Sequence, residues 1–94
     1  MTKVLLNVDG DNNIFFECIQ HAGDHDVCTI TSALCNYLCT VADCYCGVNA
    51  RTYTEGHVQL DIEGANEGVV ASFMGAMEAF NALQSLAPGA IKVY

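Results

Sequence analysis

Two histidines, two aspartates and a cysteine fall within eight positions of this 94-residue chain, in the segment HAGDHDVC at residues 21–28. Cysteine and histidine together can perform nucleophilic catalysis, because an imidazole can take the thiol proton and later return it to a leaving group. Zinc accepts the same residue types as ligands. The segment therefore raises three hypotheses: a catalytic site, a metal site, or a polar loop between two buried elements.

The positions of His21 and Cys28 favour the catalytic hypothesis. His21 ends a predicted strand, and Cys28 lies in the first turn of the helix predicted to follow. The unpaired N–H groups and the positive dipole end of a helix favour a thiolate over a thiol. The short loop between the two residues, to which Gly23 gives backbone freedom, can bring the strand end and the helix start together.

Three further residues are assigned supporting roles. Asp24 or Asp26 could orient the imidazole, as the third member of a catalytic triad does. Ser32 lies one turn after Cys28, on nearly the same side of the helix, where it could donate a hydrogen bond. Plain structural interpretations are open as well: Asp26 as a helix N-cap, Ser32 as a helix-surface residue, and the nucleophile candidate Cys28 as a small core residue.

A zinc site would draw on His21, His25 and Cys28, with Cys44 and Cys46 as further donors. The CYC pair, however, lacks the gap of two to four residues that is typical of zinc-binding motifs, and no second paired motif follows it. We therefore predict that the protein holds neither a metal nor a cofactor.

The first half of the chain supplies the elements that would position this segment. Residues 3–9 and 14–21 show the alternation of apolar and polar side chains that predicts a β-hairpin. Residues 27–47 carry apolar side chains at helical spacing and contain no glycine or proline before Gly47. They predict an amphipathic helix.

The second half repeats this arrangement. Residues 48–64 predict a second hairpin, Asn66 is expected to cap a second helix that ends at Pro88 and Gly89, and residues 90–94 predict a short last strand. The predicted order is ββαββαβ. This order indicates an α+β fold, an antiparallel sheet with two helices packed against it, in a single domain over residues 1–94.

Each predicted helix carries one apolar face. On the first helix it comprises Val27, Leu34, Cys35, Leu38, Cys39, Ala42, Tyr45 and Cys46, and on the second Val69, Val70, Phe73, Met77, Phe80 and Leu83. Three small residues, Ala71, Gly75 and Ala79, form a stripe on the second helix, which predicts close packing there.

The composition excludes several function classes. The formal net charge is −8, and the basic residues are Lys3, Arg51 and Lys92. Nucleic-acid binding requires clustered basic residues, so it is not expected. We find no secretory signal and no apolar run of about 20 residues, and therefore predict a cytoplasmic protein without membrane contact. Its six cysteines are then expected to be reduced, with Cys18 and the helix stripe buried.

The residues from His21 to Ser32 resemble those of the ribosomal-processing cysteine protease family, Prp. HAG at the strand end and DVCTITSAL at the helix start are similar to the Gly-His-Ala and Asp-x-Val-Cys-small-x-x-Ser segments of that family. The resemblance implies His21 as the catalytic base, Cys28 as the nucleophile, and Ser32 as the family's serine. Asp26, or Asp24 with a different gap, matches the acidic position.

The same resemblance implies a small α/β cysteine endopeptidase of bacteria, active as a homodimer. Such enzymes remove the N-terminal extension of a large-subunit ribosomal protein. Two departures bear on substrate fit: Gln20 stands where the family has glycine, and the loop between His21 and Cys28 is shorter. The alternative functions are a non-catalytic dimeric binding or assembly module, in which the cysteine helix is structural, and a thiol metal-binding protein.

Overall fold

The computed structural model of the chain describes residues 1–20, 25–46 and 50–94. It contains β1 (Thr2–Val8), β2 (Ile14–Ile19), α1 (His25–Tyr45), β3 (Ala50–Thr54), β4 (His57–Ile62), α2 (Glu67–Leu86) and β5 (Ile91–Val93). The predicted order ββαββαβ and the predicted α+β class are therefore confirmed.

The five strands form one sheet in the order β3-β4-β2-β1-β5. The two predicted hairpins are antiparallel, and so is the pairing of β2 with β4 that joins them. β5, however, pairs parallel with β1, so the sheet is mixed rather than wholly antiparallel. The reason is that α2 carries the chain from β4 across the sheet, and such a crossover returns the next strand in the same direction.

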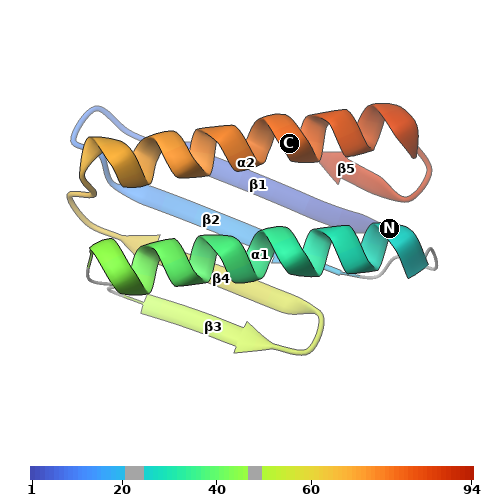
Figure 1. Cartoon of the computed structure of the whole chain (residues 1–94), viewed down its shortest axis with the longest axis horizontal. Coiled ribbons are helices and arrows are strands. Elements are labelled where there is room, and N and C mark those ends of the chain that lie inside the picture. Colours follow the sequence, from blue (N-terminus) through green and yellow to red (C-terminus); the bar gives the residue numbers. More distant parts are fainter. Residues whose placement is uncertain (21–24, 47–49) are drawn as a thin grey trace.

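Both helices lie side by side on one face of the sheet, which leaves the other face without a helical cover (Figure 1). α1 contacts β4, and α2 contacts β1 and β5. At the centre of the core, the ring of Phe16 on β2 lies 5.9 Å from that of Phe73 and 6.1 Å from that of Phe80, both on α2. These three fully buried rings fix the second helix over the middle of the sheet.

The predicted cap of the second helix is confirmed. Asn66 precedes α2, and its side-chain oxygen accepts a hydrogen bond of 2.9 Å from the backbone N–H of Val69. The predicted cap of the first helix is wrong, because α1 already begins at His25 and Asp26 lies inside its first turn. An acidic side chain in this turn still interacts favourably with the helix dipole.

The apolar face of α1 differs from the predicted one at its end. Tyr45 is 70% exposed and lies beside the start of α2, where its carbonyl accepts a hydrogen bond from the Asn66 side chain. Thr31, a polar residue outside the predicted face, is fully buried instead. By length and composition alone, α1 is apolar enough to cross a membrane, a test that a buried core helix also passes, and here α1 packs against α2 and β4.

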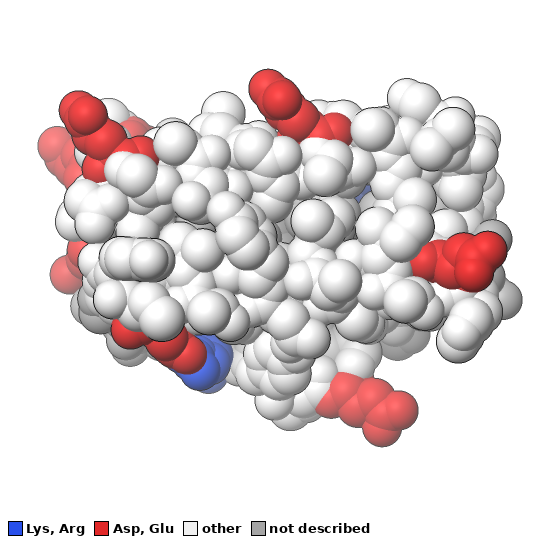
Figure 2. Space-filling view, viewed as in Figure 1, with Lys and Arg blue, Asp and Glu red and all other residues white. Residues whose placement is uncertain are grey.

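Close packing was predicted for the stripe of small residues on α2, but the structure does not show it. Ala71, Gly75 and Ala79 are exposed and line a shallow groove, together with Leu34 and Tyr37 of α1. The surrounding helical face carries few charges, and its acidic side chains lie toward the edges of the molecule (Figure 2). The two helices therefore leave an apolar surface on the side away from the sheet.

Candidate active site

Cys28 is the fourth residue of α1 and therefore lies in its first turn, as predicted. Its side chain is half-buried, and Asp26, two residues earlier, is exposed. His21, Gly23 and Asp24 lie outside the described residues, so the predicted pairing of His21 with Cys28 stays a prediction. What the structure does show is how the strand end just before His21 is held against α1.

Gln20 connects these two elements. Its side-chain Nε2 donates a hydrogen bond of 3.2 Å to Oγ of Ser32, which lies one turn after Cys28 on α1. Its backbone N–H donates to the carbonyl oxygen of Gly56, in the turn between β3 and β4, over 2.8 Å. The residue that directly precedes His21 is therefore fixed through both its backbone and its side chain.

The close approach at this turn requires glycine. Gly56 has φ of +81°, a left-handed conformation that strains other residues. A Cβ atom there would also lie only 3.3 Å from the carbonyl oxygen of Gln20. The hairpin of β3 and β4 is thus seated directly against the strand end that leads to His21.

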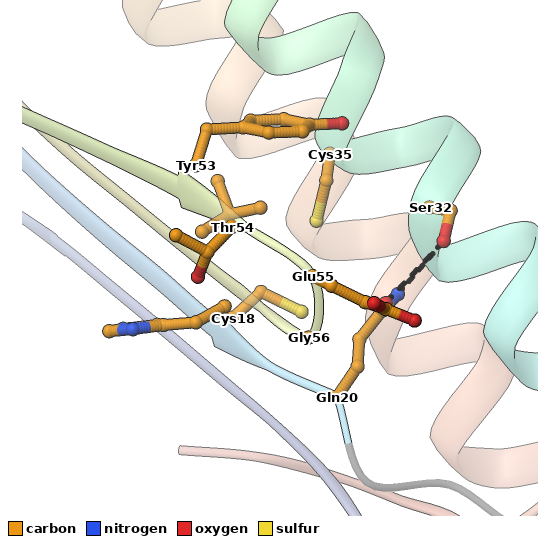
Figure 3. A pocket seen from close by; sticks show the side chains of 10 residues that line it. Cys18, Gln20, Ser32, Cys35, Tyr53, Thr54, Glu55 and Gly56 are labelled. Atoms are coloured by element: carbon orange, nitrogen blue, oxygen red, sulfur yellow. Dashed lines mark hydrogen bonds between the residues drawn. The ribbon is translucent and has the colours of Figure 1, made fainter.

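A cavity of about 240 Å³ opens where these elements meet (Figure 3). It lies between the end of β2, α1 and the turn of the second hairpin. Its lining residues are Cys18, Gln20, Ser32, Cys35, Tyr53, Thr54, Glu55, Gly56, His57 and Val58. Because Gln20 and Ser32 belong to this lining, the cavity adjoins the segment that carries the predicted catalytic pair.

All six cysteines lie among the described residues, and each is a thiol rather than half of a disulfide. Cys18, Cys35 and Cys39 are buried as predicted, whereas Cys46 is only half-buried and Cys44 is exposed. The pKa of Cys35 is raised, mainly by its hydrogen bond with Cys18 and to a smaller extent by burial. Burial raises the pKa of Cys39, against the opposing effect of the Arg51 charge, and burial also raises the pKa of Cys46. These environments keep the thiols of Cys35, Cys39 and Cys46 protonated and weakly reactive.

The zinc site built from both ends of the helix is ruled out by distance. Cys44 lies sixteen residues after Cys28 on α1, which places the two about 24 Å apart along a helix that rises 1.5 Å per residue. Among residues 1–20, 25–46 and 50–94, no group of three or more histidine, cysteine or acidic side chains is placed to hold a metal ion.

The two described histidines occupy different places. His25 is exposed at the first position of α1, three residues before Cys28. His57 starts β4, and its Nε2 lies 2.9 Å from the Glu17 carboxylate. Glu17 alternates along β2 with the buried Phe16 and Cys18, so this pair lies on the sheet face away from the helices. The sheet therefore separates the His57 ring from Cys28.

Thiol labelling should separate Cys28 from the other cysteines. In native protein at about pH 6, where an ordinary thiol is protonated, iodoacetamide is expected to modify Cys28 first. Cys44, which is exposed near the C-terminal end of α1, serves as the accessible reference thiol. Peptide mapping by mass spectrometry gives the order of labelling, and His21→Ala should slow the modification of Cys28. Equal rates at Cys28 and Cys44 would contradict an activated thiol.

Three solved structures resemble this fold over nearly its whole length. The essential ribosomal processing protease Prp from S. aureus, in complex with a covalently linked product peptide, matches with a TM-score of 0.81 at 14% identity, covering 99% of this chain and 97% of that one. Prp from S. aureus with a substrate peptide matches with a TM-score of 0.79 at 12% identity, covering 100% and 98%.

SMU.848 from Streptococcus mutans is similar as well, with a TM-score of 0.78 at 18% identity and coverage of 99% and 95%. The sequence itself matches no family model and no curated protein. At these identities the comparisons show a shared fold, and the fold implied by the resemblance to Prp is therefore confirmed.

Proposed function

We propose that this protein is a cytoplasmic cysteine endopeptidase of the Prp family, which removes the N-terminal extension of a large-subunit ribosomal protein in a bacterium. The observation that carries the proposal is the half-buried Cys28 in the first turn of α1, within a fold shared with Prp. The S. aureus structures with a product peptide and a substrate peptide support a peptide as the partner here too.

In the proposed mechanism, the Cys28 thiolate attacks the scissile carbonyl carbon and forms a thioester. His21 carries the thiol proton to the leaving amine as the C–N bond breaks, and then takes a proton from the water that hydrolyses the thioester. The backbone N–H groups at the start of α1, the positive end of the helix dipole, would stabilise the oxyanion.

The test uses a synthetic peptide that spans the N-terminal region of the host's own large-subunit ribosomal protein. Incubation with the purified protein should release the extension through a single cut, read by mass spectrometry. The Cys28→Ala variant should leave the peptide intact. If the wild-type protein also leaves it intact, the proposed activity is wrong, and the alternative of a non-catalytic binding or assembly module is favoured.

The second part of the proposal is that the protein is a homodimer. Two chains that each carry a formal charge of −8 repel one another, so they should associate through a surface with few charges. The helical face offers such a surface (Figure 2). Tyr37 lines the groove, and Tyr37, Ile30 of α1 and Met74 of α2 are each about half exposed. Light scattering at micromolar concentration should give about twice the 10.1 kDa of one chain. A mass of one chain would contradict the dimer.

A further inference from the structure

We infer that the cavity beside the predicted catalytic segment is a subsite for a lysine or arginine side chain of the peptide substrate, with the Glu55 carboxylate as its charged partner. The role in substrate binding rests on the proposed function, whereas the evidence for a cation site is the lining of the cavity. That lining combines an apolar interior with an acceptor-rich mouth.

The interior suits the aliphatic stem of a long side chain. Cys18, Cys35 and Val58 are buried and form apolar walls. The Tyr53 ring closes one side, because Tyr53 extends from β3 toward α1 and its hydroxyl donates a hydrogen bond to Oδ1 of Asn36 (Figure 3). A lysine or arginine stem can pack against such walls while its charged end stays at the polar mouth.

The mouth offers hydrogen-bond acceptors. The Glu55 side chain extends from the turn toward the Gln20–Ser32 pair (Figure 3). Gln20 Nε2 donates to Ser32 Oγ over 3.2 Å, and the Ser32 hydroxyl in turn lies 3.5 Å from the Gln20 side-chain oxygen. Both side chains line the same cavity as Glu55, and each of their oxygens keeps a lone pair for a further donor. Ammonium and guanidinium groups carry only donors, so carboxylate, amide and hydroxyl oxygens together match them.

None of the described basic side chains of the protein neutralises the Glu55 carboxylate in an ion pair that the structure shows, so a cation from a bound peptide can do so. Among the described residues, the lining of the cavity contains no lysine or arginine. Arg51, on the same strand as Tyr53, forms an ion pair with Asp43 of α1. The His57 ring interacts with Glu17 on the other face of the sheet. The overall charge of −8 attracts a basic peptide as well.

The cavity also lies at a suitable distance from the predicted nucleophile. Ser32, in its lining, is four residues after Cys28, which corresponds to about 6 Å along the helix axis. An extended peptide advances about 3.3 Å per residue. A side chain in the cavity would thus belong to a residue within about two positions of the cut.

The test measures binding without cleavage. ¹⁵N-labelled protein is titrated with N-acetyl-lysine N-methylamide and, separately, with the norleucine analogue, which keeps the stem but lacks the charge. The lysine probe should shift the NMR signals of Gln20, Ser32 and Gly56 at about fivefold lower concentration than the norleucine probe, as expected for one partly exposed ion pair. Glu55→Gln should remove this difference.

Glu78→Gln, on the exposed surface of α2, is the matched control, because it changes the net charge equally and should leave the lysine preference intact. Equal binding of both probes to the wild-type protein, no shift at the cavity, or a preference that survives Glu55→Gln would each overturn the subsite. If the lysine preference is found and the ribosomal peptide stays intact, the subsite holds and the proposed proteolytic function fails.

Discussion

Cys28→Ala should lower the rate of peptide cleavage by about a thousandfold or more, because removal of a nucleophile leaves only the binding and oxyanion contributions to catalysis. The substitution removes a single sulfur atom from a half-buried position in the first turn of α1, so the fold should persist. Cleavage followed by mass spectrometry measures the rate, and circular dichroism checks that the helical content is unchanged. Full activity of this variant would exclude the proposed mechanism.

The two neighbouring histidines provide the matched comparison. His21→Ala should reduce cleavage by a similar factor, since the thiol then lacks its base. His25→Ala should retain most activity, although His25 lies three residues before Cys28 and is therefore its neighbour on the helix surface. If His25→Ala is the inactive variant and His21→Ala the active one, the base has been assigned to the wrong histidine.

Periodicity predicts much of this fold because burial imposes it. Val58, Leu60 and Ile62 alternate along β4 and all face the core, and Asn66 caps α2 through a local contact that depends on residues three apart. The direction of β5 could not be predicted in this way, because it depends on where α2 crosses the sheet. The exposure of the small-residue stripe around Gly75 could not be predicted either. Periodicity shows which residues share a helix face, but not which element, if any, covers that face.

In the candidate site, too, features set by local sequence could be predicted, and features set by tertiary packing could not. The position of Cys28 in the first turn follows from local sequence, because the helix start can be predicted to within a residue or two. The cavity could not be predicted, since it brings Tyr53 and Glu55 of the second hairpin beside Ser32 of α1. The sequence marks Gln20 only as a departure from the glycine of the family that the chain resembles. Its contact with Ser32 depends on tertiary packing, for which a sequence carries no local signal.

The largest loss of stability is expected from Phe16→Ala. Phe16 is fully buried on β2, a central strand of the sheet, and its ring contacts Phe73 and Phe80 of α2. Removing a buried phenylalanine side chain costs about 3–5 kcal/mol, because apolar burial is lost and a cavity is left. Small domains have unfolding free energies of about 5–15 kcal/mol, so this variant should be close to unfolding.

Phe15→Ala is the control within the same strand. Phe15 points to the sheet face that carries no helix and is half-buried, so its truncation should cost clearly less, about 1–2 kcal/mol. Urea denaturation followed by circular dichroism gives both free energies of unfolding. Equal losses would contradict the assignment of the core to the helical side. Because β2 runs directly into Gln20, Phe16→Ala should also weaken peptide cleavage before it unfolds the protein, as the strand end loses its fixed position against α1.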